Sequence, residues 1–416
     1  MSFGHDMRTK RIIGAMRRIF VFFVVLISAG ILSGVPAHAV GIVLEKLKPL
    51  TVPDYIPEEE FKAQTKLVKA TPYEDKFLAY QVRLPKDFEQ TATDKKLNFD
   101  FIDRKVSGFE DAEKGKVSER VLGVVSRYTG APNKLQRMTF SVEASELTYE
   151  ISARNWFINY IVSNGLVIEQ IGLEGKDEIE ALYVEVRGDT TYVVRALAIK
   201  NGPRMVIARF ALPMDLYDDN WILQAQVLKS FTLLNREGTQ IEEREVYGFL
   251  DQSYMKYLQS WKLQAPNIRS IDRMRATVFY NIRNDKLDGQ IDVFLANKEE
   301  LNTTRQDEIK WHCDKIAVED YSLGQLIETH KMSYHEDIEY GVTQAYEYIP
   351  KRPDMLQYEL WFSFLEGEEY YYVVTLLTPS RLKDFEAWAR NTEAYKIMLK
   401  EVRRSGKGLE YYRYLL

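Results

Sequence analysis

The chain has 416 residues, of which 45% are hydrophobic and 28% charged, with a formal net charge of −5. This length and composition are typical of a globular protein of two or three domains. The acidic balance argues against nucleic acid, or an anionic membrane surface, as the main partner. The single cysteine, Cys313, excludes an intramolecular disulfide, and a chain of this size can be stable without one.

Residues 1–39 show the three parts of a secretory signal peptide. Five basic residues precede an apolar run from Ile19 to Ile27, and Ala37-His38-Ala39 supplies a small-x-small cleavage site. We therefore expect an exported protein, periplasmic or alternatively extracellular, whose mature chain begins at Val40. Removal of the segment leaves 51 basic and 60 acidic residues, a net charge of −9.

Two alternatives to an ordinary cleaved signal follow from the same residues. An uncleaved segment would anchor the chain in a membrane, because the stretch 19–35 has about the shortest length that spans a bilayer, roughly 17 residues. Membrane contact is expected only in that case. Arg17-Arg18 resembles a twin-arginine export motif, but the strongly apolar run and the lack of a cofactor motif favour export of the unfolded chain.

The mature chain begins with an extended N-terminal arm, predicted over 40–70. Several prolines surround the acidic patch Glu58-Glu59-Glu60, which indicates extended chain interrupted by one short helix. That helix is expected directly after Pro57, because proline suits the first turn of a helix.

Two segments, 71–235 and 247–405, then follow the same order of predicted elements. In each, a strand that runs into a proline is followed by a hairpin, a helix that carries a tryptophan, a long apolar hairpin and an amphipathic helix. In the first segment these elements are 77–85, 121–129 with 138–142, the Trp156 helix, 191–199 with 205–212, and a helix from about Asp219. In the second they are 257–266, 276–283 with 290–295, the Trp311 helix, 356–365 with 370–377, and a helix over 385–402. The charged residues 236–246 link the two segments, and 406–416 form an aromatic tail.

The first segment ends in a helix that leads into Ser230-Phe231. Together with the strand before Pro85 and the long central hairpin, this pattern resembles the PsbP-like α/β/α sandwich. That fold occurs in photosystem accessory proteins, in a nuclear-import release factor and in bacterial envelope proteins of the DcrB type. The resemblance covers 65–235 well and 245–405 less well, where the Ser-Phe strand is missing. It implies an α+β fold of two tandem α/β/α sandwiches with antiparallel sheets, and a role in binding or scaffolding without catalytic residues.

The sequence predicts no catalytic residue, cofactor or metal site. It lacks a Gly-x-Ser-x-Gly elbow and a glycine-rich phosphate loop, and its carboxylates are too numerous for a catalytic pair to be singled out. Cys313 shares a helical face with Ile309 and Ile316, which is typical of a small core residue. His330 and His335 are interpreted as part of a solvated polar loop, with a metal site as the alternative.

Five aromatic residues are candidates for a partner-binding surface: Trp361, Tyr370, Tyr372, Tyr411 and Tyr412. Alternation along the second long hairpin places Tyr370 and Tyr372 on one face of the sheet and Tyr371 on the other. Amphipathic rings suit contact with protein or sugar. The alternative is that these tyrosines cover a sheet beneath a helix.

Together, these patterns predict an exported, non-catalytic accessory or scaffolding protein of an envelope assembly. It is expected to bind other envelope proteins through a sheet face or edge, its N-terminal arm or its C-terminal tail. Two alternatives stay open: a hydrolase that uses carboxylates in a cleft between the domains, and a periplasmic protein that binds a small ligand or a metal.

Overall fold

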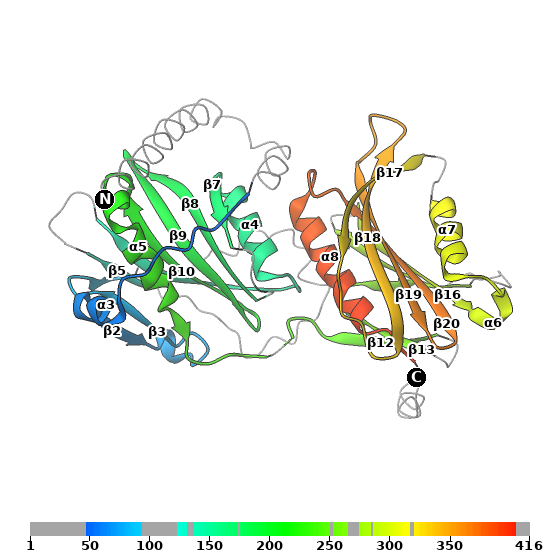
Figure 1. The fold of residues 1–416 in the computed structure, drawn as a ribbon, viewed down its shortest axis with the longest axis horizontal. Coiled ribbons are helices and arrows are strands. Elements are labelled where there is room, and N and C mark those ends of the chain that lie inside the picture. Colours follow the sequence, from blue (N-terminus) through cyan, green and yellow to red (C-terminus); the bar gives the residue numbers. More distant parts are fainter. Residues whose placement is uncertain are drawn as a thin grey trace, which may run out of the picture.

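The computed structural model describes residues 47–93, 123–130, 137–172, 175, 177–238, 240–249, 253–264, 274–283, 286–316 and 320–404. They form a mixed α+β protein, in which a few helices lie on mostly antiparallel sheets (Figure 1), as the sequence predicted. The predicted signal segment 1–39 and tail 406–416 lie outside the described residues. None of the described helices is both long enough and apolar enough to cross a membrane.

The first half of the chain contains one large and one small sheet. The large sheet has eight strands in the order β1-β7-β8-β9-β10-β6-β5-β4, and only β1 with β7 is parallel. Its strands are β1 (Lys48–Pro49), β4 (Glu89–Thr91), β5 (Gly123–Thr129), β6 (Thr139–Glu146), β7 (Val167–Ile171), β8 (Glu178–Arg187), β9 (Thr190–Asn201) and β10 (Arg204–Pro213). The small sheet has the order β11-β3-β2, with β2 (Thr65–Ala70), β3 (Tyr80–Pro85) and β11 (Thr232–Leu233).

Helices cover both faces of this large sheet. Helix α5 (Met214–Lys229) packs on β9 and β10, and its Val227 and Leu228 share a core with the small sheet. Helix α4 (Ala153–Ser163) lies on the opposite face, over β7, β8 and β9. Helix α5 starts at Met214, earlier than the predicted start near Asp219, and Asp215 in its first turn carries the charge that favours a helix N-terminus.

The second half has the same kind of construction. Its large sheet has seven strands in the order β14-β15-β16-β20-β19-β18-β17, and its small sheet has the order β12-β13-β21. The strands are β12 (Arg244–Phe249), β13 (Ser253–Leu258), β14 (Lys262–Gln264), β15 (Met274–Arg283), β16 (Lys286–Asn297), β17 (Tyr321–His330), β18 (Ile338–Pro350), β19 (Tyr358–Gly367), β20 (Tyr370–Pro379) and β21 (Arg403–Arg404). The helices are α6 (Lys298–Leu301), α7 (Arg305–Ile316) and α8 (Phe385–Lys400).

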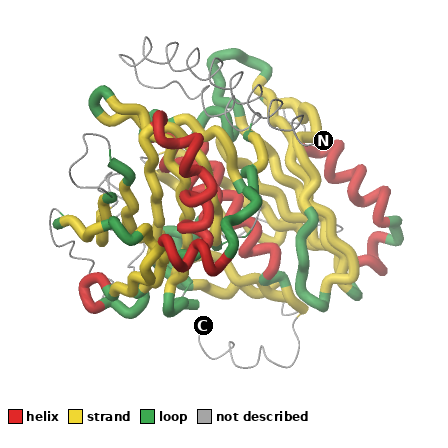
Figure 2. Tube along the Cα trace, turned by 60° about the vertical axis from the view of Figure 1, so that its left-hand side comes forward, coloured by secondary structure: helices red, strands yellow, loops and turns green. Residues whose placement is uncertain are grey.

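The spatial order of strands is the same in the two halves. Strands β7 to β10 followed by β6, β5 and β4 correspond in position to β17 to β20 followed by β16, β15 and β14. The small sheets match as well, with β2, β3 and β11 in the positions of β12, β13 and β21. Figure 2 shows helices lying against the broad faces of the strands in a second view.

The strand predicted over 257–266 is interrupted in the structure. Strand β13 ends at Leu258, the Trp261 amide donates a hydrogen bond to the Leu258 carbonyl, and β14 begins at Lys262. Trp261 is buried in the core, so the chain turns to place its indole there. The antiparallel pairs β7–β8 and β17–β18 were not predicted, and they form one edge region of each large sheet.

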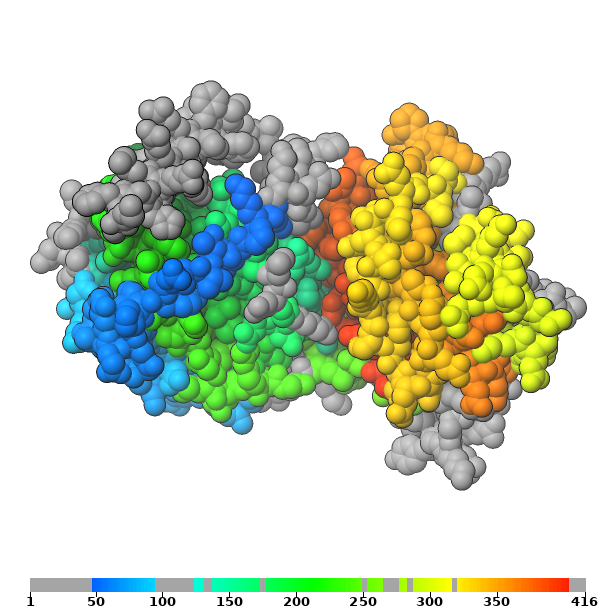
Figure 3. Space-filling view, in the orientation of Figure 1, coloured from blue at the N-terminus to red at the C-terminus, as the bar shows by residue number. Residues whose placement is uncertain are grey.

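The described part of the N-terminal arm is bound to its own chain, across the first half (blue in Figure 3). Strand β1 pairs with β7, and the Ile56 backbone exchanges two hydrogen bonds with the Gln226 amide. The short helix expected after Pro57 is present as α3 (Glu58–Gln64), whose Phe61 is buried. Residues 65–70, predicted as the end of the arm, instead form β2, because β3 offers them an antiparallel partner.

The halves meet where α4 and α8 pack together, in the centre of Figure 1. Two buried glutamates join the linker to the first half nearby. The Glu150 amide donates to Glu242 Oε1 at 3.0 Å, and the Ile241 amide donates to Glu150 Oε1 at 2.9 Å. Lys200 Nζ donates to Glu150 Oε2 at 2.7 Å. Burial raises the pKa of Glu242 above its ordinary value of 4.5, and the Glu150 carboxylate also raises it, although hydrogen bonds from Ser260 and from the Glu150 backbone oppose this.

Replacing Glu242 with glutamine is expected to stabilise the protein at pH 8 relative to the wild type. Because the folded-state pKa is raised, ionising Glu242 destabilises the wild type increasingly as pH rises above 4.5, its value in the unfolded chain. The side-chain carbonyl oxygen of glutamine can still accept the hydrogen bond from the Glu150 amide, and glutamine carries no charge. Melting temperatures at pH 4 and pH 8 test this, with the exposed Glu243→Gln as control. A melting temperature below that of the wild type at pH 8 would show that the carboxylate itself is needed.

Candidate functional site

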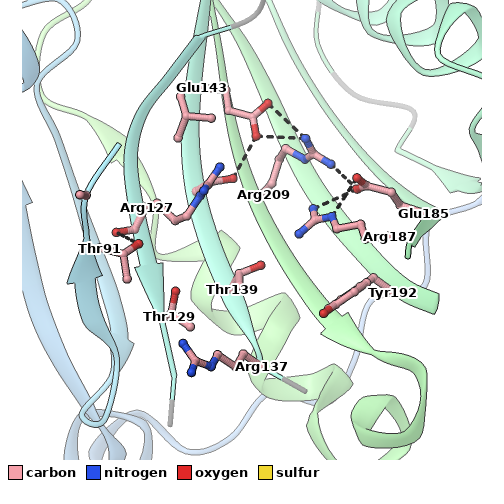
Figure 4. A pocket seen from close by; sticks show the side chains of 13 residues that line it. Thr91, Arg127, Thr129, Arg137, Thr139, Glu143, Glu185, Arg187, Tyr192 and Arg209 are labelled. Atoms are coloured by element: carbon pink, nitrogen blue, oxygen red, sulfur yellow. Dashed lines mark hydrogen bonds and ion pairs between the residues drawn. The ribbon is translucent and has the colours of Figure 1, made fainter. Parts of the chain in front are cut away.

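A polar hollow lies on the α4 face of the first large sheet, beside the strands that α4 leaves uncovered (Figure 4). Its volume is about 730 Å³. The lining residues are Thr91, Ala92, Val124, Arg127, Thr129, Arg137, Thr139, Ser141, Glu143, Glu185, Arg187, Tyr192 and Arg209. They come from β4, β5, β6, β8, β9 and β10 and the chain beside them, so the sheet itself brings together residues that are far apart in sequence.

Strand alternation explains why polar side chains gather on this face. Along β6, Thr139, Ser141 and Glu143 line the hollow, whereas Phe140 and Val142 point into the core beneath α5. The pairing of strands then sets neighbours side by side. Ser141 lies opposite Arg127 of β5 and opposite Arg209 of β10.

Arg209 is the central charged group of the hollow. Its Nη1 donates to both carboxylate oxygens of Glu143, at 3.0 and 3.2 Å, and its Nη2 donates to Glu185 Oε2 at 2.6 Å. Arg187 Nε donates to Glu185 Oε1 at 2.9 Å. Because Arg209 is only 8% and Glu143 only 6% exposed, the ion pair between them is largely shielded from water.

Electrostatics favour the charged forms of Glu185 and Arg209. Burial opposes ionisation of Glu185, but hydrogen bonds and charge from Arg187 and Arg209 outweigh it and hold the pKa of Glu185 below 4.5. Burial alone would lower the pKa of Arg209, yet the surrounding acidic groups raise it above its ordinary value. A catalytic acid or base needs a pKa close to the working pH. Glu185 and Arg209 therefore suit binding rather than proton transfer.

The arginines outnumber the carboxylates that line the hollow. Four arginines face two glutamates, which leaves a net charge of +2 in a chain whose overall charge is −5. Among the described residues, the guanidinium of the exposed Arg127 has no hydrogen-bond or ion-pair partner. Arg209 Nε is buried and likewise has no hydrogen-bond partner among the described residues. An arginine with unpaired N–H groups is suited to recognise a carboxylate or phosphate group.

The aromatic residues predicted to form a partner surface lie elsewhere, and two of them are buried. Trp361 is 0% exposed and Tyr372 is 4% exposed, so neither can form such a surface. The reason is that α8 covers one face of the second large sheet and α7 the other. Tyr370 is partly buried against the same core as Tyr372. Tyr411 and Tyr412 lie outside the described residues.

The two histidines do not converge on one point. The His330 ring stacks on Trp361 with 4.3 Å between ring centres, and its Nε2 lies 3.1 Å from Glu328 Oε1. His335 Nδ1 instead lies 3.1 Å from Asp337 Oδ2. Within the part of the chain that the structure describes, no group of three or more His, Cys, Asp or Glu side chains could hold a metal ion.

Cys313 lies on α7 and packs, partly buried, against the core beneath that helix. Burial raises the pKa of its thiol, which disfavours the reactive thiolate. The neighbouring His312 points toward Glu308, and its Nε2 lies 3.0 Å from Glu308 Oε1.

Sequence reasoning did not find the hollow. The available signal was a charged residue inside an otherwise apolar strand, such as Arg209 between Ala208 and Phe210, or Glu143 between Val142 and Ala144. Such residues indicate a paired polar group on a sheet face. Their partners, however, come from strands that only the fold brings together.

No protein-family model matches this chain, and neither does any curated protein sequence. Among solved structures, cyanobacterial PsbP (CyanoP) from Synechocystis sp. is similar at 14% identity and a TM-score of 0.29, over 41% of this chain and 98% of that chain. The Ran-binding protein Mog1p from Saccharomyces cerevisiae is similar at 11% identity and a TM-score of 0.29, over 40% of this chain and 98% of that chain. The fold and the hollow thus define a mixed α+β protein with a positively charged polar site, and likenesses at this level assign it no activity.

Proposed function

We propose that this chain is an exported, non-catalytic binding protein of two PsbP-like domains, and that the hollow of its first domain holds an anionic ligand. The signal pattern of residues 1–39 supports export to the periplasm. The matching strand order of the two halves supports a tandem duplication. The proposal of an anionic ligand rests on the excess of arginines over carboxylates in the hollow, with Arg127 unpaired among the described residues.

Several features favour binding over turnover. The volume of about 730 Å³ lies within the range of small-molecule sites. Both glutamates of the hollow form ion pairs with Arg209, and the lowered pKa of Glu185 does not suit the protonated acid that a carboxylate-dependent hydrolase requires. At the junction of the halves, Glu150 and Glu242 use their carboxylates to fix backbone amides of the linker region.

A scaffolding role in an envelope assembly is the second candidate function, and one observation favours it. Strand β17 ends the order of the second large sheet, and its Leu326 and Ile327 are 48% and 40% exposed. An edge strand with exposed apolar side chains can add a strand from another chain. In this role the partner would be another envelope protein.

Replacing Arg127 with alanine is expected to weaken the binding of an anion to the mature chain by about 10- to 100-fold, the value of a charge-assisted hydrogen bond. Citrate is the probe, and isothermal titration calorimetry at low salt is the measurement. The exposed Arg352→Ala in the second half is the matched control and should bind as the wild type does. Equal affinity of the Arg127 variant and the wild type, or no binding to either, would refute the proposed site.

A further inference from the structure

The lining of the hollow is polar almost throughout. Eleven of its thirteen residues carry a charged group or a hydroxyl, and the two exceptions are Ala92 and Val124. Small-molecule sites are usually lined mainly by apolar side chains with a few polar groups. The ligand of this hollow must therefore satisfy polar groups over most of its surface, which excludes a lipid or another apolar molecule.

The polar groups fall into two sectors. In one, Glu143 and Glu185 present carboxylate oxygens beside Arg209 and Arg187. In the other, Arg127 stands free of such partners among the described residues. A compact anion such as inorganic phosphate suits the Arg127 sector but offers few donors to the carboxylate oxygens of the other sector. A ligand hydroxyl suits the carboxylate sector, because it donates to a carboxylate and accepts from a guanidinium.

Threonine hydroxyls lie between these sectors. Thr129 and Thr139 face each other across β5 and β6, and neither side chain makes a hydrogen bond within the described residues. Thr129 is only 6% exposed, and its side chain lines the hollow, where its hydroxyl can contact a ligand. Tyr192, the one aromatic residue of the lining, lies across the hollow from Arg127 (Figure 4). Its ring is held by Arg187, whose Cζ is 5.0 Å from the ring centre.

From this arrangement we infer that the ligand is an acidic sugar, with its carboxylate or phosphate at Arg127 and its hydroxyls at the threonines and Glu143. The inference rests on the proposed anion-binding function and names the class of molecule that bears the anion. An amphipathic tyrosine ring suits the apolar face of a sugar ring, which the other lining residues leave without a partner. A carboxylate and a phosphate can both accept hydrogen bonds from the Arg127 guanidinium, and the experiment distinguishes between them.

The test is calorimetric titration of the mature chain with four probes: glucuronate, a hexose phosphate, neutral glucose and inorganic phosphate. We expect one of the two acidic sugars to bind at least tenfold more tightly than both glucose and inorganic phosphate. The better of the two identifies a carboxylate or a phosphate as the acidic group. Inorganic phosphate that binds as tightly as both acidic sugars would overturn the acidic sugar and leave the anion site in place. Absence of binding to all four probes would overturn both.

Variants keep the test specific. Thr129→Val and Thr139→Val preserve side-chain shape and should weaken the acidic sugar at least fivefold while leaving inorganic phosphate unchanged. Arg127→Ala should weaken both probes. Circular dichroism confirms that each variant is folded before titration. If Thr129→Val and Thr139→Val both bind the sugar as the wild type does, the hydroxyl contacts are wrong and the inference fails.

Discussion

Replacing Arg209 with methionine is expected to lower the free energy of unfolding of the first half by about 3–5 kcal/mol. The variant leaves Glu143 and Glu185 without the cation between them, and the side chains of these glutamates are only 8% and 20% exposed. An unpaired buried carboxylate must be ionised without compensation or take up a proton, and either costs stability. Native-state hydrogen exchange of β6 and β10 measures the effect in this half separately.

Two further variants separate charge pairing from packing. Arg187→Met should cost less than about 1 kcal/mol, because the Arg187 side chain is 41% exposed and its ion pair with Glu185 lies near water. The triple variant Arg209→Met, Glu143→Gln, Glu185→Gln should recover most of the loss, because both unpaired charges are removed. A loss below 1 kcal/mol in the single Arg209 variant would show that the network adds little to the stability of the sheet.

Local features of the fold could be predicted because their signals are local. The turn between β9 and β10 consists of Gly202 and Pro203, because Asn201 pairs with Arg204, and Gly202 at its first position has a φ of +61°. Helix α4 ends at Ser163, and Gly165, two residues on, has a φ of +69° that favours glycine. The alternation of apolar residues predicted β6 and β16, because one face of each strand packs against a hydrophobic core.

The site could not be predicted because it depends on sheet order and register. Arg209 meets Glu143 and Glu185 only because β6 and β9 flank β10, and β8 pairs with β9. The sequences of the individual strands do not indicate this order. The burial of Trp361 and Tyr372 was missed for a related reason. Trp361 lies in a strand whose pattern fits either an open or a covered sheet face, and the position of α8 decides between them.

The second half contains a buried charge cluster of its own, centred on Arg381. Its guanidinium donates to both oxygens of Glu359, at 2.8 Å each, and to Glu328 Oε1 at 2.8 Å. Trp388 Nε1 donates to Glu359 Oε2 at 2.8 Å. Burial opposes ionisation of Glu328, but the hydrogen bond with His330 and the charge of Arg381 lower its pKa to about 2. Arg381 thus compensates a carboxylate, Glu359, that is only 2% exposed.

Replacing Arg381 with methionine is expected to lower the stability of the second half by about 3–5 kcal/mol, because Glu359 is left buried without its cation. Arg381→Lys should recover only part of this, since lysine keeps the charge but lacks the two-pronged guanidinium. The pH dependence follows from Glu328: its lowered pKa stabilises the fold above pH 4.5, and this contribution is lost as pH falls toward 2. Urea unfolding of the second half at pH 3 and pH 7 should therefore differ less in the methionine variant than in the wild type. An equal pH dependence in the two proteins would show that the Glu328–Arg381 pair does not stabilise the folded state.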